Sequence, residues 1–262
     1  MLPPYHAGME RIEIDGVGLE VQRLPGRSKQ APIVFLHEGL GSVAMWRDWP
    51  AEVCAAAGRS GIVYSRRGYG NSDPVPDVRG AGRLAPDYMH REAWNVLPRL
   101  LAALGMAQPV LLGHSDGGSI ALLHASRHPV SACIVMAPHV LVEEVSLRSI
   151  EASRDAYQAE LKERLGRYHA DVDVAFWQWN DVWLSPAFRA FDIRHECHLI
   201  RAPLLAVQGL DDAYGSMRQI EEIAPTQGRF AMERLAGCGH SPHRDKPDLT
   251  RQLIVDFLAA LP

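Results

Sequence analysis

Short apolar runs that alternate with stretches of helical periodicity constrain the fold of this chain more than any other feature. The apolar runs lie at residues 31–37, 61–65, 109–113, 131–137 and 203–209. Near-continuous apolar runs of this length are typical of strands that are buried on both faces of a parallel sheet. The helix-like stretches lie at residues 45–57, 87–104, 115–127 and 247–261. This alternation predicts crossover connections and one mostly parallel sheet flanked by helices, which is an α/β fold.

Two segments depart from the simple alternation. RIEIDG and GLEVQRL flank the turn residues Asp15 and Gly16, and this pattern predicts an antiparallel hairpin at an edge of the sheet. About 60 residues, rich in charge and tryptophan, separate the strand that ends near Pro138 from the strand that begins at Pro203. Because a crossover needs only about a dozen residues, we expect a helical insertion there. It should lie over the carboxyl end of the sheet, where ligands bind in open α/β folds.

Composition excludes several classes of protein. The chain has 262 residues, of which 47% are apolar and 22% are charged, and its net charge is −4. These values indicate an ordinary globular protein rather than a disordered, collagen-like or disulfide-rich one. The basic residues are scattered along the chain, so we expect no nucleic-acid surface.

The sequence also indicates a cytoplasmic protein with no membrane partner. The N-terminal residues carry no apolar core flanked by basic residues, so we expect no signal peptide. No run approaches the ~18 apolar residues of a membrane span. The four cysteines lie far apart, with no CxxC motif, which favours free thiols in a reducing compartment. We expect a small-molecule substrate as the partner, and homo-oligomerisation stays open.

The strongest local signal is the sequence Gly113-His114-Ser115-Asp116-Gly117, a G-x-S-x-G pattern between a predicted strand and a predicted helix. A serine on such a sharp turn takes a strained backbone conformation, and glycine two positions to either side avoids clashes. The turn places Ser115 at a helix N-terminus, where free N–H groups favour developing negative charge. We predict a nucleophilic Ser115. The alternative is a tight turn with an incidental serine.

A serine nucleophile needs a histidine base, and the base needs a carboxylate to orient it. Among the twelve histidines, His240 lies in the glycine-containing loop LAGCGHSPHRDKP before the last predicted helix. His243 in the same loop is its rival. Asp211 and Asp212 follow the end of a predicted strand. Only one of these adjacent acids can face a given histidine, so the other is expected to serve a turn or a helix cap.

The reaction further requires N–H donors where negative charge develops on the attacked carbonyl. One candidate is the backbone N–H of Asp116, which follows the predicted nucleophile. The second is expected in the loop HEGLGS after the first buried strand. Gly39 is the first choice there and Leu40 the second, because glycine lets the backbone approach a ligand closely. His37 and His114 flank the site, and we interpret them as packing or hydrogen-bonding residues.

Five motifs occur in order along the chain: HEGLGS, YSRRGYGNSDP, GHSDGG, QGLDDAYG and GCGHSPHRDKP. Through them the sequence resembles the α/β-hydrolase superfamily over nearly its whole length, most closely the capped serine hydrolases of biphenyl-hydrolase-like and carboxylesterase-like type. The resemblance implies a catalytic triad of Ser115, Asp212 and His240. It favours Asp212 over Asp211 because the family's acid lies three residues past the strand-end glycine. Epoxide hydrolases and haloalkane dehalogenases use an aspartate nucleophile, so the serine argues against both.

The resemblance also divides the chain into a core of residues 1–138 and 201–262 and a helical cap of residues 139–200. Aromatic residues are dense in this cap: Phe176, Trp177, Trp179, Trp183 and Phe188. They either pack the cap onto the core or line an apolar acyl pocket. Both interpretations stay open.

One residue departs from the family's pattern. Many relatives have glycine after the histidine of the oxyanion loop, whereas this chain has Glu38. A carboxylate that faced the oxyanion would oppose catalysis, so we expect Glu38 to point away from Ser115, toward Arg66 or Arg67. For the Asp116 side chain, we expect either a favourable charge at the helix N-terminus or attraction of a substrate ammonium group.

These observations predict a cofactor-independent serine hydrolase that cleaves a small carboxylic ester through an acyl-enzyme. No metal is expected, because HECH lacks the HExxH spacing, and the glycine-rich stretches lack nucleotide-binding patterns. The rival enzyme is a carbon–carbon bond hydrolase acting on a ring-cleavage product. Its substrate carboxylate would need cations such as Arg189 or Arg194. The non-enzymatic alternative is a ligand receptor that keeps the triad without turnover.

Overall fold

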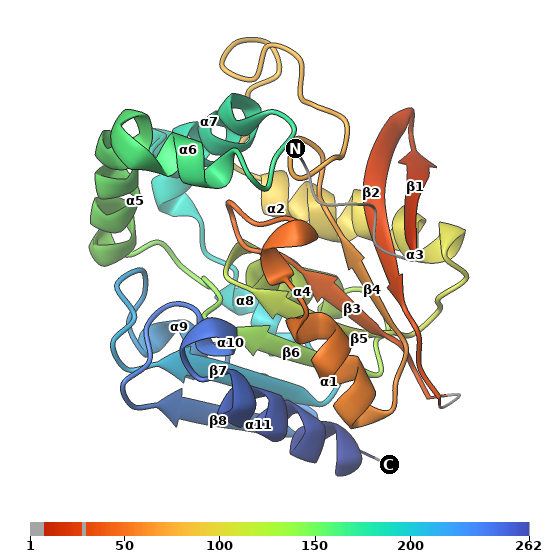
Figure 1. Ribbon diagram of the computed structural model, residues 1–262. Helices are drawn as coiled ribbons and strands as arrows, with labels where there is room; N and C mark the ends of the chain where they lie inside the picture. The colour runs from red at the N-terminus through yellow and green to blue at the C-terminus, as the bar shows by residue number, and fades with distance from the viewer. Residues whose placement is uncertain (1–7, 28–29, 262) are drawn as a thin grey trace.

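The fold is built on an eight-stranded sheet with the strand order β1-β2-β4-β3-β5-β6-β7-β8 (Figure 1). The strands are β1 (Met9–Ile14), β2 (Val17–Leu24), β3 (Ile33–Leu36), β4 (Gly61–Tyr64), β5 (Val110–His114), β6 (Ala132–Met136), β7 (Leu204–Gly209) and β8 (Phe230–Leu235). β2 pairs antiparallel with β1 and β4, and the other described pairs are parallel. The computed structural model describes residues 8–27 and 30–261. The first seven residues of the predicted core lie outside the described residues. The expectation that the chain has no signal peptide falls partly on them.

The predicted α/β fold with a mostly parallel sheet is confirmed. β3 illustrates why a continuous apolar run predicts a strand of such a sheet. Val34 and Leu36 pack into the core on one face of the sheet, while Ile33 and Phe35 pack into the core on the other face. Because successive side chains of a strand point to opposite faces, a strand covered on both sides has to be apolar throughout.

The predicted hairpin is also present at the edge of the sheet. Ile14 pairs with Val17 across the turn, and the two turn residues, Asp15 and Gly16, have φ values of 53° and 75°. A two-residue turn with positive φ at both central positions matches the twist of the flanking strands. Aspartate and glycine tolerate that conformation at low cost.

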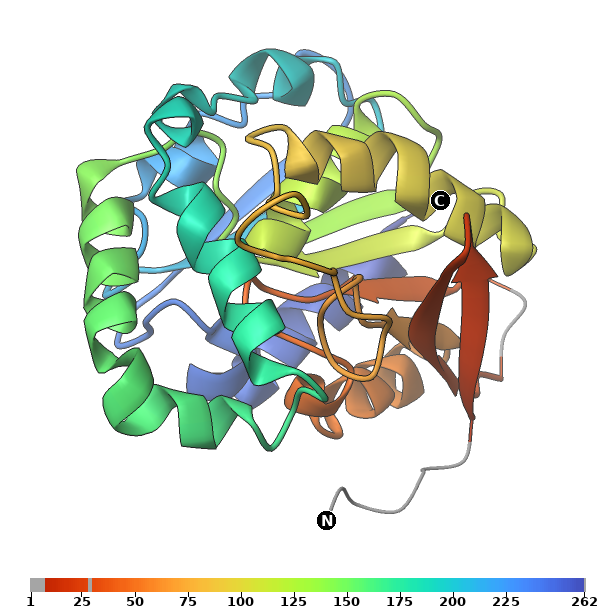
Figure 2. The ribbon, with the colours of Figure 1, turned by 90° about the horizontal axis from the view of Figure 1, so that it is seen from above.

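Helices cover both faces of the sheet (Figures 1 and 2). They are α1 (Trp49–Ala57), α2 (Tyr88–Arg91), α3 (Leu97–Ala103), α4 (Asp116–Ala125), α9 (Arg218–Glu221), α10 (Pro242–Asp245) and α11 (Pro247–Ala259). α1 and α11 share one hydrophobic cluster with the sheet, and α2, α3 and α4 belong to the cluster on the other face. Two clusters, one on each face, make a three-layer core.

The helix predicted at residues 45–57 is divided. A 3₁₀ turn at Ala44–Trp46 comes first, and α1 begins only at Trp49. Arg47 lies between them with a φ of 55°. A positive φ cannot continue a right-handed helix, so the chain changes direction at this residue.

The helix predicted at residues 87–104 is continuous but widens in the middle. α2 leads into a π turn at Glu92–Val96, and α3 follows. Pro98 lies in the first turn of α3. A proline ring clashes with the carbonyl four residues earlier and donates no hydrogen bond, and the wider turn accommodates both effects.

Residues 139–200 are the predicted cap and are called the cap segment below. They form α5 (Glu144–Ala156), α6 (Lys162–Leu165), α7 (Val172–Trp183) and α8 (Arg194–His198), with a π turn at Tyr157–Leu161 and a 3₁₀ turn at Pro186–Ala190. Figures 1 and 2 show α5, α6 and α7 grouped at one end of the sheet, whereas α8 lies beside α4. Among the helices of residues 8–27 and 30–261, none has the length and apolar character needed to cross a bilayer.

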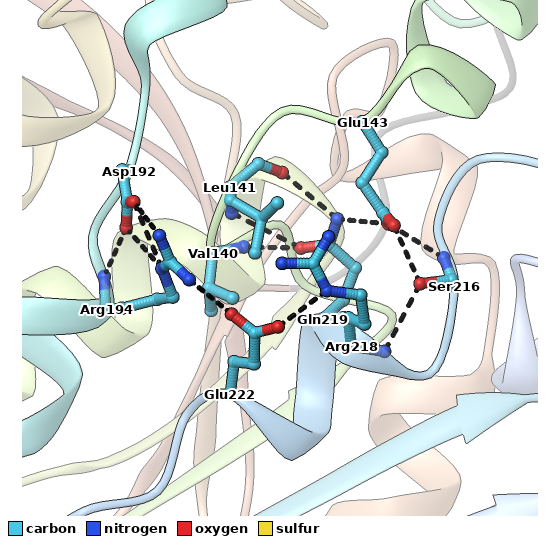
Figure 3. Close-up of polar contacts among 9 residues, drawn as sticks. All are labelled: Val140, Leu141, Glu143, Asp192, Arg194, Ser216, Arg218, Gln219 and Glu222. Carbon is cyan, nitrogen blue, oxygen red and sulfur yellow. Dashed lines mark hydrogen bonds and ion pairs between the residues drawn. The ribbon is translucent and has the colours of Figure 1, made fainter.

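Gln219 of α9 fastens the start of the cap segment to the core (Figure 3). Its amide oxygen accepts a hydrogen bond from the Val140 N–H at 2.8 Å. Its amide nitrogen donates to the Leu141 carbonyl at 3.0 Å and to the Glu143 carboxylate at 2.7 Å. Leu141 also forms a β-bridge with Asp192 near the other end of the segment. The two ends of the cap segment therefore lie side by side where they join the core. The Gln219 side chain that holds the first of them is fully buried.

Candidate active site

Ser115 occupies the sharp turn between β5 and α4. Its backbone has a φ of 52° and a ψ of −120°, a conformation that costs a non-glycine residue about 1–3 kcal/mol. The flanking glycines make the turn sterically feasible. A Cβ at Gly113 would lie 2.1 Å from the Gly117 carbonyl oxygen, and a Cβ at Gly117 would lie 2.0 Å from the Leu36 carbonyl oxygen. Both glycines are thus required for the close approach of α4 to the strand ends.

A chain of hydrogen bonds joins the serine to two distant loops. Nε2 of His240 lies 2.9 Å from Oγ of Ser115, and Nδ1 of His240 lies 2.9 Å from both carboxylate oxygens of Asp212. The aspartate can only accept, so Nδ1 carries the proton that it donates and Nε2 accepts from the serine hydroxyl. The structure brings together the three residues expected to form the triad.

Asp212 is held as a buried carboxylate. The Tyr214 N–H donates to one oxygen at 2.7 Å, and the Gln208 amide donates to the other at 2.9 Å. Burial alone would raise the pKa of Asp212, but the hydrogen bond and charge of His240, with the Tyr214 N–H, hold this pKa below its ordinary value. The neighbouring Asp211 is exposed and uses its backbone N–H to bind the Cys238 carbonyl.

His240 is enclosed by aromatic and imidazole rings. The Tyr214 ring lies 4.7 Å away, between ring centroids, and the His139 ring lies 5.7 Å away. Burial, followed by the charge of His240, lowers the pKa of His139 to about 3, so this neighbour stays neutral. Nε2 of His114 donates to the His240 carbonyl at 2.7 Å, which fits the expected hydrogen-bonding role of His114.

The rival base, His243, belongs to a different cluster. Its ring packs on Trp46 and Trp49 at centroid distances of 4.8 and 5.5 Å. Burial lowers the pKa of His243 well below its ordinary value. Since His240 and not His243 contacts Ser115, the structure favours His240 as the base.

The Asp116 side chain is buried and engaged by three partners. The Tyr88 hydroxyl donates to it at 2.6 Å, the Trp183 indole N–H donates at 3.2 Å, and the Arg66 guanidinium lies 3.7 Å away. Burial raises the pKa of Asp116, although Arg66 opposes this effect. Because only 1% of the side chain is exposed, these contacts leave little room for a substrate ammonium. The carboxylate instead joins the cap segment to the core.

The predicted oxyanion loop lies against the N-terminus of α4. A Cβ at Gly117 would meet the His37 carbonyl oxygen at 2.6 Å, and a Cβ at Gly39 would meet the indole of Trp179 at 2.2 Å. Only glycine therefore fits between the loop and this cap residue. The Leu40 carbonyl accepts a hydrogen bond from His169 at 3.0 Å, so the cap segment also holds the next residue of the loop.

The prediction that the Glu38 side chain points toward Arg66 or Arg67 was wrong. Its carboxylate pairs with Arg244 of α10 at 3.0 Å and lies 3.4 Å from Nδ1 of His114. Although burial opposes ionisation, these neighbours hold the pKa of Glu38 well below its usual range. Arg66 binds the backbone carbonyl of Glu38 instead of the side chain. The partner lies 206 positions away, in a short helix whose approach to Glu38 the sequence does not reveal.

Some aromatic residues of the cap segment pack against other side chains, and others contact residues near Ser115. Phe176 stacks on Tyr157 at 3.8 Å, the Trp177 ring faces the Arg79 guanidinium at 3.9 Å, and Phe188 packs on Trp183 at 4.7 Å. Trp179 lies against Gly39 of the predicted oxyanion loop, and Trp183 donates to the Asp116 carboxylate.

Sequence reasoning missed three residues around the serine: Arg66, Tyr88 and Tyr214. Arg66 was considered only as a partner for Glu38, and Tyr88 carries no local signal. Tyr214, two residues after the acid, could have been noticed by its spacing. Within the described residues, no three His, Cys, Asp or Glu side chains converge as a metal site requires.

Comparisons with known proteins assign the chain to a family. A model of the alpha/beta hydrolase family matches residues 33–253. The chain is 34% identical over 273 residues to a proline iminopeptidase of Lactobacillus delbrueckii subsp. lactis, which covers 87% of this chain and 90% of that protein. It is 28% identical over 283 residues to an sn-1-specific diacylglycerol lipase of Mus musculus, covering 97% and 89%.

A solved structure shares the fold of this chain. The enol-lactonase from Burkholderia xenovorans LB400 matches with a TM-score of 0.73 and 22% identity, over 95% of this chain and 100% of that one. The chain therefore belongs to the alpha/beta hydrolase family, and hydrolysis is the class of reaction that this family supports.

Proposed function

We propose that the protein is a serine hydrolase that cleaves small carboxylic esters through an acyl-enzyme. The observation that carries the proposal is the hydrogen-bond chain from Ser115 through His240 to Asp212, with 2.9 Å at each contact. A serine hydroxyl becomes a competent nucleophile when a neutral histidine accepts its proton and a buried carboxylate fixes the histidine tautomer. Residues 139–200 would act as the cap over this site.

The reaction proceeds in two acyl-transfer steps. Oγ of Ser115 attacks the ester carbonyl while Nε2 of His240 takes the hydroxyl proton. The N–H groups of Asp116 and Gly39 hold the negative oxygen of the tetrahedral intermediate. The intermediate collapses when His240 gives that proton to the leaving alcohol. His240 then takes a proton from water, which attacks the acyl-enzyme. The histidine returns this proton to Oγ of Ser115 as the carboxylic acid leaves.

Two rival substrates receive less support. A ring-cleavage product would need cations for its carboxylate, but Arg189 pairs with Glu144 at 2.6 Å and Arg194 pairs with Asp192 and Glu222, all by partly or largely exposed side chains. An amino-acid ester or peptide would need a free carboxylate for its ammonium group, and the Asp116 carboxylate is already engaged.

Labelling with a fluorophosphonate tests the proposal directly. Wild-type protein and the Ser131→Ala control, whose hydroxyl binds the Gln108 carbonyl far from the site, should both be labelled, and Ser115→Ala should not. The labelled wild type should also hydrolyse nitrophenyl esters faster than amino-acid esters or a ring-cleavage product. Labelling that persists in Ser115→Ala, or a labelled protein that turns over no ester, would contradict the proposal.

The pH dependence supplies a second test. Only neutral His240 can accept the serine proton, so kcat should be lower in acid than at neutral pH. A kcat that does not fall in acid would count against His240 as the base.

A further inference from the structure

Arg66 is a buried cation at the base of the predicted oxyanion loop. It follows β4, and only 6% of its side chain is exposed. One terminal nitrogen of its guanidinium donates to the Glu38 carbonyl oxygen at 3.0 Å. The other terminal nitrogen lies 3.7 Å from the Asp116 carboxylate, which compensates the buried charge. The guanidinium therefore lies between the loop and the residue that follows the serine.

His37 acts on the same carbonyl. Its Nδ1 lies 2.6 Å from the Glu38 carbonyl oxygen, and because a carbonyl can only accept, Nδ1 is the donor. Its Nε2 accepts from the backbone N–H of Arg66 at 3.0 Å. Burial, together with the charge of Arg66, lowers the pKa of His37 well below its ordinary value. His37 is thus a neutral ring in one fixed tautomer. The Glu38 carbonyl receives hydrogen bonds from His37 and Arg66, and a third from the Gly41 N–H at 3.1 Å.

Because the peptide bond is planar, the direction of the Glu38 carbonyl determines the direction of the Gly39 N–H. The Glu38 carbonyl and the Gly39 N–H belong to one peptide unit, and in a trans peptide they point in opposite directions. Among the described residues no peptide bond is cis, and no protein acceptor takes the Gly39 N–H. With its carbonyl fixed toward Arg66 and His37, this peptide directs its N–H to the opposite side, away from the arginine.

We propose that Arg66 and His37 are positioning residues that orient and polarise the Glu38–Gly39 peptide, making the Gly39 N–H the second oxyanion donor. The side-chain donors of Arg66 and His37 add to the Gly41 N–H on this carbonyl, withdraw electron density from the peptide and strengthen its N–H as a donor. The inference rests on the proposed serine hydrolase function. The inference also favours Gly39 over Leu40 as the second oxyanion donor. The Leu40 N–H shares a peptide unit with the Gly39 carbonyl, and the described residues provide no such pair of donors for that carbonyl.

Substrate binding is the alternative role of Arg66, and the experiment must distinguish it from the positioning role. The residue also lines a cavity of about 600 Å³ with Arg67, Tyr69 and Tyr88. In that position the guanidinium would bind the carboxylate of an anionic substrate. A residue that holds substrate changes KM for that substrate, whereas a residue that supports the oxyanion site changes kcat for every substrate.

The experiment compares Arg66→Gln with the control Arg229→Gln. Arg229 precedes β8 and donates to the Ala260 carbonyl at 3.3 Å on the surface. With a neutral and an anionic nitrophenyl ester, Arg66→Gln should lower kcat by about 10- to 100-fold for both and leave KM within about twofold, because oxyanion donors act on the transition state. Arg229→Gln should behave as wild type. Guanidinium ion added to Arg66→Ala should restore part of the lost kcat.

A boronic acid, which forms a tetrahedral adduct with the serine, should bind Arg66→Gln more weakly by a similar factor. If Arg66→Gln fails to fold with Asp116 uncompensated, the double variant Arg66→Gln/Asp116→Asn removes both charges and should show the same loss of kcat. An unchanged kcat in a folded variant would overturn this proposal, and so would a rise in KM confined to the anionic ester. Either result leaves the serine hydrolase intact if the wild type is labelled and active, whereas an unlabelled, inactive wild type overturns both proposals.

Discussion

The Ser146 hydroxyl on α5 donates a hydrogen bond to the Tyr214 carbonyl oxygen at 2.5 Å. One helical turn further, the Ser149 hydroxyl donates to the Ala213 carbonyl at 2.5 Å. Residues three apart lie on the same face of a helix, so the two serines face the same loop. That loop carries Asp212, and the cap segment therefore helps to hold this proposed catalytic acid in place.

The double variant Ser146→Ala/Ser149→Ala should lower kcat about tenfold, because the acid and the base lose part of their alignment, a cost of about 1.4 kcal/mol in the barrier. The loss of two hydrogen bonds should also lower the free energy of unfolding by about 1–3 kcal/mol. Steady-state kinetics and urea unfolding measure the two effects. Ser126→Ala removes a hydroxyl that binds the Leu123 carbonyl at 2.7 Å, and this control should affect stability alone. If the double variant also keeps its kcat, the cap does not position the acid.

Replacing the acid tests which of two adjacent aspartates orients the base. Asp212→Asn offers His240 an amide donor in place of an acceptor and favours the wrong tautomer, so kcat should fall by about 10⁴. Asp211→Asn is the matched control, because its side chain is exposed, and its kcat should stay within about twofold of wild type. Circular dichroism should show that both variants are folded. A larger loss in Asp211→Asn than in Asp212→Asn would reverse the assignment.

The indole N–H of Trp183 links α7 to the core through Asp116 and Tyr88, at 3.2 and 3.1 Å. Trp183→Phe keeps an aromatic ring but leaves the buried carboxylate short of a donor, so the free energy of unfolding should fall by about 1–3 kcal/mol. Trp177→Phe on the same helix removes the same atoms from a ring that faces the Arg79 guanidinium. That control should cost less than about 1 kcal/mol. Equal losses in the urea titrations would show that the hydrogen bonds add nothing.

Acid should destabilise the protein through its buried neutral histidines. Burial lowers the pKa of His124 to about 4, while the unfolded chain takes up this proton near pH 6.5. The stabilising effect of the neutral ring is therefore present above about pH 6.5 and is lost as the pH falls toward 4, at about 1.4 kcal/mol per pH unit. His124→Gln keeps a donor for the Ala93 carbonyl and should lose stability less steeply over this range.

Urea unfolding at several pH values measures that slope. His195→Gln replaces an exposed histidine and should leave the slope unchanged. The same slope in His124→Gln as in wild type would show that His124 takes up no proton on acid unfolding.

Much of the fold was predictable because its determinants are local. The apolar run that becomes β5, the glycines around Ser115 and the pair Asp15 and Gly16 each act on neighbouring backbone. The helix at residues 45–57 was the exception, because the positive φ of Arg47 has no marker such as glycine. Strand and turn propensities act over a few residues, so they can be read without knowing the rest of the molecule.

The sequence by itself determined the elements and the residue types at the carboxyl ends of the strands, including Ser115, the pair of acids and His240. Only the tertiary structure decided the partners of Glu38, the contacts of Arg66 and the attachment of α5 to the loop that carries Asp212. These contacts join residues that lie between 28 and 206 positions apart. Their geometry depends on how whole loops pack against one another, and no short-range periodicity or propensity encodes that packing.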